Sequence, residues 1–424
     1  MLERQPKILF FCDPFTPPAF LPRVRYFCDY FQKKGWNITL ITENHREQKL
    51  LPENINLQLV DYYHFKNGFL FKIEWLFKTV LNLIFDHKGK YFYRKSKKVL
   101  KNNDFDLIFC SCTFHSFPLT TAAMAAKKLN LPFFVDLRDV FEQTPLESNH
   151  IFVHKIPTFI GKFLTKHYKK INLKRRNKSL KLTNGISSVS KWHSDFLKNY
   201  NSNSYTIYNG FDENLFLHEI IKADKFYISY FGNIENENTK NPDVFFKAIS
   251  NLKNEQKISD NNLCIKFFCD NNSRKTVENS AKKYEIENFV HFENFVTQQT
   301  LVSKMNRSAI LLIFSNKVGT KGFLGIMTTK FSEYIGCNRP ILCTPNNNDE
   351  LAQTIDLINC GLVSSDVAEV EKFILEKYAE WQKNGYTKST ISPENREKFS
   401  RKNGAEMLEK ILLSTDYTDL HRIK

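Results

Sequence analysis

The sequence predicts an α/β fold made of two Rossmann-like, doubly wound domains that face a cleft. Three observations lead to this prediction: the length of 424 residues, a repeated alternation of short apolar runs with helical segments, and one break between two such series. A chain of this length is too long to pack around one ordinary hydrophobic core, so two domains are expected. Strands that alternate with helices indicate parallel sheets with helices packed on both faces.

The first series opens with an apolar run, a proline-rich turn and a helical pattern from Arg23 to Lys34 that stops at Gly35. Short apolar runs bounded by turn residues are typical of buried parallel strands. We therefore predict strands at 7–12, 37–42, 107–112, 133–137, 185–189 and 205–208.

The second series begins at Phe226, after a break between Phe216 and Lys225. Its predicted strands lie at 226–232, 264–269, 289–292, 309–314 and 340–343. We expect domains at 1–215 and 225–393, followed by a helical segment and tail at 394–424. Open α/β sheets bind ligands beyond the carboxyl ends of their strands, so the site is expected there.

Composition and the N-terminal residues narrow the class of protein. Hydrophobic residues make up 42% of the chain and charged residues 25%, which excludes wholesale disorder. The start, MLERQPKILFFCDPF, runs from charged residues straight into a strand and lacks the regions of a signal peptide, so a cytoplasmic chain is expected. Nine cysteines, an odd number at scattered positions, indicate buried free thiols.

The formal net charge of +16 is concentrated in two segments. Ten basic residues and no acidic residue lie between Ile151 and Lys181, and ten basic residues against two acidic ones lie between Tyr62 and Lys101. Both segments carry bulky apolar residues in runs shorter than the roughly 20 residues that span a bilayer. They favour a monotopic contact with an anionic membrane. The candidate membrane-surface residues are Lys72, Trp75, Lys78, Lys166, Lys170 and Arg175.

Two other interpretations of the basic segments remain open. They also fit ordinary amphipathic helices whose apolar stripes face the core. A nucleic acid is the rival partner for a basic surface, but the sequence has no helix-turn-helix, zinc-finger or RNP-like motif, so no nucleic acid is expected.

The most informative segment is Gly325-Ile-Met-Thr-Thr-Lys-Phe-Ser-Glu-Tyr334. A glycine-containing loop that enters a helix offers backbone N–H groups to a diphosphate, and Lys330 adds a positive charge there. Glu333 follows about one helical turn later and is suited to accept hydrogen bonds from two vicinal hydroxyls, such as those of ribose. The alternative is a threonine N-cap followed by ordinary helix residues.

This segment, followed by Asn338-Arg-Pro-Ile-Leu342, resembles the donor-binding region of glycosyltransferase family 4, whose members are retaining enzymes with the GT-B fold. Further segments resemble that family in the expected order, over nearly the whole chain. They are Pro17-Pro18 with Arg23, Val135-Asp-Leu-Arg-Asp139, Ile186-Ser-Ser-Val-Ser-Lys191, Ile207-Tyr-Asn-Gly-Phe-Asp212, Tyr230-Phe-Gly-Asn233 and Lys240-Asn-Pro242.

The resemblance implies that the domain at 225–393 binds a nucleotide sugar. Gly232 would admit the donor diphosphate, two lysines would neutralise it, Glu333 would hold the ribose, and Phe295-Val296 would frame the base. The domain at 1–215 would then take the acceptor, with His115 and Asp139 as catalytic candidates and Arg23 and Arg138 on the acceptor side. The donor-binding candidates are Gly232, Asn233, Lys240, Thr328, Thr329, Lys330 and Glu333.

The chain departs from the family pattern at two places. Many members carry two glutamates separated by seven residues, and the earlier position here is Gly325. The first loop, Phe15 to Pro22, lacks the glycines of many relatives.

Metal-binding patterns are weak. Asp104-Phe-Asp106 matches a D-x-D string but stands on the amino side of a strand, so we interpret it as structural. No other cluster has ligand spacing, and we expect neither a metal nor another cofactor.

The sequence thus predicts a retaining glycosyltransferase that moves a sugar from a nucleotide sugar to an acceptor hydroxyl. A lipid-linked saccharide of cell-surface polysaccharide or glycan synthesis is the expected acceptor, at the inner face of the cell membrane. Two alternatives stay open. One is a non-catalytic GT-B protein that binds sugar nucleotides or glycans, which the missing glutamate motivates. The other is a sugar-nucleotide epimerase on the same fold.

Overall fold

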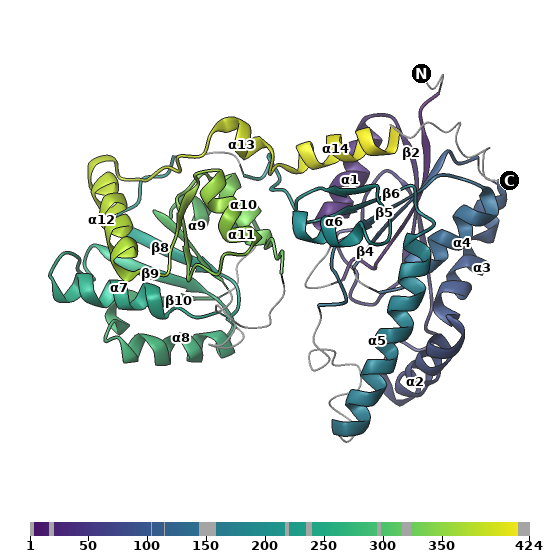
Figure 1. Cartoon of the computed structure of the whole chain (residues 1–424), viewed down its shortest axis with the longest axis horizontal. Helices are drawn as coiled ribbons and strands as arrows, with labels where there is room; N and C mark the ends of the chain where they lie inside the picture. Colours follow the sequence, from purple (N-terminus) through teal and green to yellow (C-terminus); the bar gives the residue numbers. More distant parts are fainter. Residues whose placement is uncertain are drawn as a thin grey trace. The chain divides into compact units, whose positions relative to one another are not determined.

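The computed structural model describes residues 4–16, 21–102, 104–113, 115–143, 158–216, 220–234, 240–294, 298–315 and 324–413. Its contacts divide the chain into two units (Figure 1). Unit 1 comprises Met1–Tyr208 and Ala405–Lys424, and unit 2 comprises Asn209–Gly404. The chain therefore leaves unit 1 once and returns to it at its C-terminal end.

Unit 1 is built on a seven-stranded sheet in the order β3-β2-β1-β4-β5-β6-β7, and every pair of neighbours is parallel. This is the Rossmann order with one strand added at the edge. The strands are β1 (Lys7–Cys12), β2 (Asn37–Glu43), β3 (Asn56–Val60), β4 (Leu107–Cys112), β5 (Phe133–Leu137), β6 (Gly185–Ser188) and β7 (Ser204–Thr206).

Helices cover both faces of this sheet, because successive side chains of a strand point to opposite sides. Ile8 and Phe10 of β1 belong to one core cluster, whereas Leu9 and Phe11 belong to another. The helices of unit 1 are α1 (Pro22–Lys33), α2 (Gly68–Phe85), α3 (His87–Asn102), α4 (Leu119–Leu129), α5 (Thr158–Leu180) and α6 (Lys191–Leu197).

Unit 2 repeats the architecture with six strands in the order β10-β9-β8-β11-β12-β13, again all parallel. Its strands are β8 (Phe226–Phe231), β9 (Leu263–Phe268), β10 (Val290–Glu293), β11 (Ile310–Phe314), β12 (Ile341–Thr344) and β13 (Gly361–Val363). Its helices are α7 (Asp243–Asn254), α8 (Asn271–Lys283), η1 (Glu287–Phe289), α9 (Gln298–Asn306), α10 (Thr329–Cys337), α11 (Glu350–Leu357), α12 (Val367–Asn384) and α13 (Pro393–Glu397).

The last helix, α14 (Arg401–Leu413), begins in unit 2 and ends in unit 1. Ala405, Leu408 and Leu412 on it are buried in the same core cluster as Val24 and Phe27 of α1. The C-terminal end of the chain thus completes one face of the first sheet.

Two parallel sheets with helices on both faces confirm the predicted fold class. The sequence analysis did not predict β3 and β13. Strand β3 lies at the sheet edge with only Val60 buried, and β13 has only three residues, so neither forms the buried apolar run that marks a central strand.

The D-x-D string has protein partners at the amino side of the first sheet. Arg4 donates to the carboxylates of Asp104 (3.1 Å) and Asp106 (2.9 Å), and the Lys7 amide donates to Asp106 (2.7 Å). Both aspartates therefore connect the start of β1 to the turn before β4.

The described residues of the two basic segments lie largely in α2, α3 and α5. Within the described part of the chain, no helix combines the length and apolar character needed to cross a membrane.

Candidate functional site

The site in unit 2 lies where the strand order of the sheet reverses. From the neighbouring strands β8 and β11, the chain proceeds to β9 on one side and β12 on the other. In open α/β sheets such a point leaves a crevice beyond the carboxyl ends of the two strands. Gly232 directly follows β8, and α10 follows the connection after β11.

Gly232 and Lys330 meet closely at this edge. Gly232 has φ +124°, and a Cβ atom there would lie 2.6 Å from Lys330 Nζ and 2.8 Å from its Cε. The Lys330 ammonium group donates to the hydroxyl of buried Tyr230 (3.1 Å) and lies 4.3 Å from the centre of that ring. Glycine is required here by both its backbone conformation and the close approach of the lysine.

A second lysine reaches the same corner. Lys240 Nζ donates to the backbone carbonyl of Asn233 (3.0 Å), and the Asn233 side chain accepts from the Asp270 amide (3.2 Å). Burial foremost, and then Lys240, lower the pKa of Lys330 to about 7, whereas Glu333 acts in the opposite direction. Two ammonium groups held close together favour an anionic ligand that relieves their repulsion.

Helix α10 presents its N-terminus beside the lysines. Thr328 is the N-cap, in an extended conformation, and its side chain accepts from the Phe331 amide (3.4 Å). The N–H groups of a first helical turn have no acceptor within the helix and bind anions well. Upstream, Gly325 has φ +67°, a conformation that disfavours the glutamate found there in the resembling family.

Glu333 lies one turn into α10, on the same side as Lys330. Lys330 and Glu333 each keep part of their surface exposed, but the surrounding protein atoms desolvate the ammonium and carboxylate groups. Burial raises the pKa of Glu333 to about 7, against the opposing effects of Arg401 and Lys330. The hydroxyl of buried Tyr334 accepts from the Phe231 amide (3.3 Å) and thereby ties α10 to the end of β8.

Unit 2 therefore brings together the predicted donor-binding residues. Paired lysines, a glycine turn and helix amides match the chemistry of a diphosphate, and a carboxylate one turn away matches a vicinal diol. The residues concerned are Gly232, Asn233, Lys240, Thr328, Thr329, Lys330 and Glu333.

Sequence reasoning missed two residues that support this corner. Tyr230 was named above only as the first residue of a resembling segment, without a role, and its hydroxyl accepts from Lys330. Arg401 donates to the Gly210 carbonyl (3.0 Å) and to Asp212 (3.4 Å), and a Cβ on Gly210 would lie 2.3 Å from the Arg401 nitrogen. Arg401 carries no motif, although the glycine of Tyr208-Asn-Gly-Phe-Asp212 does indicate that another backbone approaches closely.

In unit 1, Asp136 of β5 forms a buried pair with Arg23 of α1. Arg23 donates twice to Asp136, at 2.9 and 3.1 Å, and once to the Tyr208 carbonyl (2.8 Å). Asp136 has no exposed surface and also accepts from Ser111 and Ser187. Burial has the largest single effect and raises the pKa of Asp136, but the charge and hydrogen bonds of Arg23, together with Ser187 and Arg138, outweigh it, so the net direction is downward. Arg23 thus joins α1 to β5.

Arg138 and Asp139 follow β5, and Arg138 pairs with Asp13 beyond β1 (2.7 Å). Asp13 also accepts from the Thr113 amide (2.8 Å), so it connects the ends of β1, β4 and β5. Asp139 keeps much of its surface open, although desolvation by its surroundings raises its pKa against the effect of Arg138.

His115 lies just beyond β4, and its Nδ1 atom is 3.4 Å from the Tyr168 hydroxyl of α5. Burial lowers the pKa of His115 to about 4, so the ring is neutral at neutral pH. A neutral imidazole contributes to a site as a hydrogen-bonding group.

The candidate membrane-surface residues divide into two groups. Lys72 of α2 and Lys166 and Lys170 of α5 are exposed. Trp75 and Lys78 line a cavity, and Arg175 donates to the Leu83 carbonyl (2.8 Å) at the end of α2.

Some predicted features lie outside the described residues: Pro17-Pro18 and Phe295-Val296. Among the residues that are described, no group of three or more His, Cys, Asp or Glu side chains is arranged to hold a metal.

Three solved structures resemble this chain over nearly its whole length. HepE from Anabaena, solved in complex with UDP, has a TM-score of 0.62 at 14% identity and covers 96% of this chain and 100% of its own. A glycosyltransferase from Rickettsia africae has a TM-score of 0.61 at 13% identity, covering 99% and 100%. Sucrose-phosphate synthase from Thermosynechococcus elongatus has a TM-score of 0.59 at 11% identity, covering 97% and 99%.

No protein-family model matches the sequence, and no curated protein matches it. At identities this low the structural likeness establishes the fold. The chain has the GT-B fold of nucleotide-sugar glycosyltransferases.

Proposed function

We propose that this protein is a retaining glycosyltransferase that transfers a sugar from a nucleotide sugar to an acceptor hydroxyl. The observation that carries the proposal is the corner at the carboxyl end of β8, where Gly232, Lys330 and Lys240 stand beside the N-terminus of α10 and Glu333 follows one turn later. HepE, which shares the fold, was solved with UDP and with UDP-glucose, so uridine donors are the first to test.

In this proposal the residues of unit 2 act on the leaving group. The bond between the sugar and the diphosphate breaks, and negative charge develops on the departing phosphate. Lys330, Lys240 and the first amides of α10 would stabilise that charge without reorganisation, because they are already held in place. Glu333 would hold the ribose hydroxyls and thereby fix the position of the diphosphate relative to the lysines. No metal is required by this arrangement.

We further propose that the acceptor is a lipid-linked saccharide and that the protein is peripheral on the inner face of the cell membrane. The basic residues Lys72, Lys166 and Lys170 are exposed and suit an anionic leaflet. All nine cysteines are buried and unpaired, as expected for a reducing compartment.

The test is nucleotide binding followed by turnover. Thermal shifts with UDP, GDP, ADP and their sugar conjugates, with magnesium or with EDTA, identify the base and any dependence on a metal. We expect one nucleotide to stabilise the protein in both conditions. Replacing Glu333 with Ala should weaken that nucleotide about 10- to 100-fold, the usual cost of hydrogen bonds to a charged group. Unchanged affinity in this variant would contradict the proposed ribose contact.

Turnover separates the proposal from its two alternatives. Release of nucleotide together with formation of a glycoside of retained configuration supports the transferase. Nucleotide binding with neither transfer nor donor hydrolysis would indicate a binding protein. Conversion of one sugar nucleotide into its epimer without an acceptor would indicate an epimerase.

A further inference from the structure

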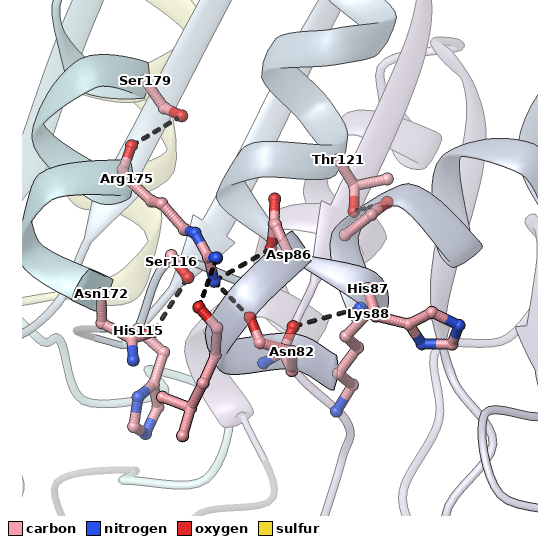
Figure 2. A network of polar contacts seen from close by, with 12 residues as sticks. Asn82, Asp86, His87, Lys88, His115, Ser116, Thr121, Asn172, Arg175 and Ser179 are labelled. Carbon is pink, nitrogen blue, oxygen red and sulfur yellow. Dashed lines mark hydrogen bonds and ion pairs between the residues drawn. The ribbon is translucent and has the colours of Figure 1, made fainter. Parts of the chain in front are cut away.

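A second candidate site lies within unit 1, in a cavity of about 290 Å³ beyond the carboxyl ends of its strands. It is lined by the last residue of β2, by residues that follow β1, β3 and β4, and by residues of α2, α5 and the start of α3. Figure 2 shows five of the lining residues: Asn82 of α2, Lys88 of α3, His115 and Ser116 from the loop after β4, and Asn172 of α5.

The lining combines aromatic rings with polar groups. Tyr62, Tyr63, Trp75 and Tyr168 supply the rings, and Asp13 and Asn172 are among the polar residues. Aromatic faces pack against apolar C–H surfaces, while carboxylates and amides accept and donate hydrogen bonds. A sugar ring carries both kinds of surface, and the cavity volume is at the small end of the range for ligand sites.

The charges in the cavity are balanced by ion pairs. Lys88 pairs with Glu43 (2.6 Å), Lys78 pairs with Glu74 (2.7 Å), and Asp13 pairs with Arg138 (2.7 Å). Lys78 also donates to the Tyr62 carbonyl and lies over that ring, 4.7 Å from its centre. A cavity whose lysines already have carboxylate partners favours a neutral polyhydroxyl ligand over a diphosphate.

One wall of the cavity is a helix with two contrasting faces. Trp75, Lys78, Thr79 and Asn82 of α2 follow the spacing i, i+3, i+4, i+7 and line the cavity. None of the 18 residues of α2 is fully buried. The other face carries apolar side chains that are 45 to 75% exposed: Phe69, Leu70, Ile73, Leu76, Phe77, Val80 and Ile84.

The exposed residues of α2 and of α5 combine apolar side chains with lysines, including Lys72 on α2. Helix α5 runs beside α2 in Figure 1, and the hydrogen bond from Arg175 to the Leu83 carbonyl joins the two helices. Phe163 of α5 is 60% exposed, next in the chain to exposed Lys162 and close to Lys166. An exposed apolar stripe bordered by basic residues fits the interface of an anionic bilayer.

We propose that the cavity of unit 1 holds a sugar ring of an acceptor whose lipid chain stays in the membrane beside α2. The inference rests on the proposed function and locates the sugar of its acceptor in one cavity of unit 1. One face of α2 lies in the bilayer interface and the other forms the wall of the sugar site. The acceptor saccharide therefore enters from the membrane surface without leaving its lipid anchor.

Thiol protection tests this proposal, because all nine native cysteines are buried. Two variants, Thr79→Cys on the cavity side of α2 and Phe77→Cys on its outer face, are alkylated with a maleimide. The probes are dodecyl pyranosides of glucose, galactose, mannose and N-acetylglucosamine, each below its micelle concentration. Dodecylphosphocholine, with the same chain but no sugar, is the control.

We expect at least one pyranoside to slow alkylation of Thr79→Cys, by about tenfold at ten times its Kd, while dodecylphosphocholine does not. Vesicles of phosphatidylcholine and phosphatidylglycerol should slow Phe77→Cys and leave Thr79→Cys reactive. Adding Trp75→Ala to Thr79→Cys should remove the protection by the sugar, whereas Leu76→Ala, one residue along but on the outer face, should preserve it.

The proposal is overturned if no pyranoside protects Thr79→Cys, or if dodecylphosphocholine protects it equally. Nucleotide binding is measured on the same samples by thermal shift. Binding of a nucleotide without protection overturns the sugar site alone. Protection without binding of any nucleotide supports the sugar site and overturns the proposed transferase.

Discussion

At the scale of single residues, the corner around Lys330 depends on groups that lie far apart in the sequence. Gly232 leaves room for the lysine, Tyr230 holds its ammonium group, and Lys240 adds a second positive charge. This crowding makes the site responsive to an anion, because a bound diphosphate replaces the repulsion between two lysines by attraction to both.

Binding of a nucleoside diphosphate should depend on the charge of Lys330. The pKa of this lysine is lowered to about 7 in the free protein, and a bound diphosphate favours its protonated form. Affinity should therefore fall as pH rises from about 7 to 9, where protonation must accompany binding. Calorimetric titration at a series of pH values measures this slope.

Two variants serve as controls for the dependence of nucleotide affinity on pH. Lys330→Gln should bind about 10- to 100-fold more weakly at pH 6.5 and lose most of the slope. Lys240→Gln should also bind the nucleotide more weakly, but its affinity should still fall with rising pH. The fall should occur at higher pH, because the variant lacks a charge that lowers the pKa of Lys330. An unchanged slope in Lys330→Gln would contradict this account.

The buried pair of Arg23 and Asp136 should contribute to stability. Replacing either partner alone leaves an uncompensated buried charge, so Arg23→Leu or Asp136→Leu should lower the free energy of unfolding by about 3–5 kcal/mol. The double variant should lose less than the sum of the two. The exposed pair of Arg25 and Asp29 on the same helix is the comparison, with an expected effect below about 1 kcal/mol for Arg25→Ala. Urea denaturation measures all four proteins.

At the scale of elements, α2 differs from every other long helix of the described residues in lacking a buried side chain. A helix with this much exposed apolar surface is costly in water unless a partner covers it. Its cavity face is nonetheless fixed by contacts to Tyr62 and to α5. The fold therefore holds the helix in place while leaving its apolar face outward.

Removing apolar side chains from that outer face should reduce membrane binding. The pair Ile73→Ser and Phe77→Ser removes two exposed side chains, worth about 3 kcal/mol of transfer free energy together, or about 100-fold in partitioning. Co-sedimentation with vesicles of seven parts phosphatidylcholine and three parts phosphatidylglycerol measures this loss. Stability in urea should stay unchanged because both residues are exposed.

A matched control is available in unit 2, where Leu357 of α11 is 84% exposed. Leu357→Ser should not affect vesicle binding. If Leu357→Ser lost as much vesicle binding as the α2 variant, exposed apolar residues would contribute to membrane binding regardless of their position. That result would contradict a specific role for α2.

At the scale of the whole molecule, α14 ends in the core of unit 1 although the chain from Asn209 to Gly404, including the start of this helix, belongs to unit 2. Leu408 is buried there, whereas Leu413 on the same helix is 44% exposed. The C-terminal end of the chain therefore contributes to the stability of the N-terminal sheet.

Calorimetry of two variants should distinguish the contribution of buried Leu408 to stability from that of exposed Leu413. Leu408→Ala should destabilise unit 1 by about 2–5 kcal/mol, and Leu413→Ala by less than about 0.5 kcal/mol. Because Leu408 belongs to the core of unit 1 whereas Lys330 and Glu333 belong to unit 2, the stabilisation that a nucleotide provides should be the same in both variants. Loss of the nucleotide effect in Leu408→Ala alone would contradict this assignment.

The sequence alone determined the alternation of strands and helices, and it named most residues of the corner around Lys330. Buried parallel strands are short continuous apolar runs, and the central strands β1, β4, β8 and β11 have that signature. Thr328, Lys330 and Glu333 were predictable because a helix N-terminus places neighbours in sequence beside one another in space.

Only the tertiary structure decided which distant groups complete these sites. Asp136 pairs with Arg23, 113 residues away in the sequence, and Arg401 donates to the carbonyl of Gly210, 191 residues away. Sequence spacing does not indicate these contacts, because only the folding of the chain creates them. Trp75 and Lys78 line a cavity because the contacts of α2 with Tyr62 and with α5 fix the orientation of this helix about its axis. Local patterns encode the faces of a helix, but the packing of neighbouring elements selects which face turns inward.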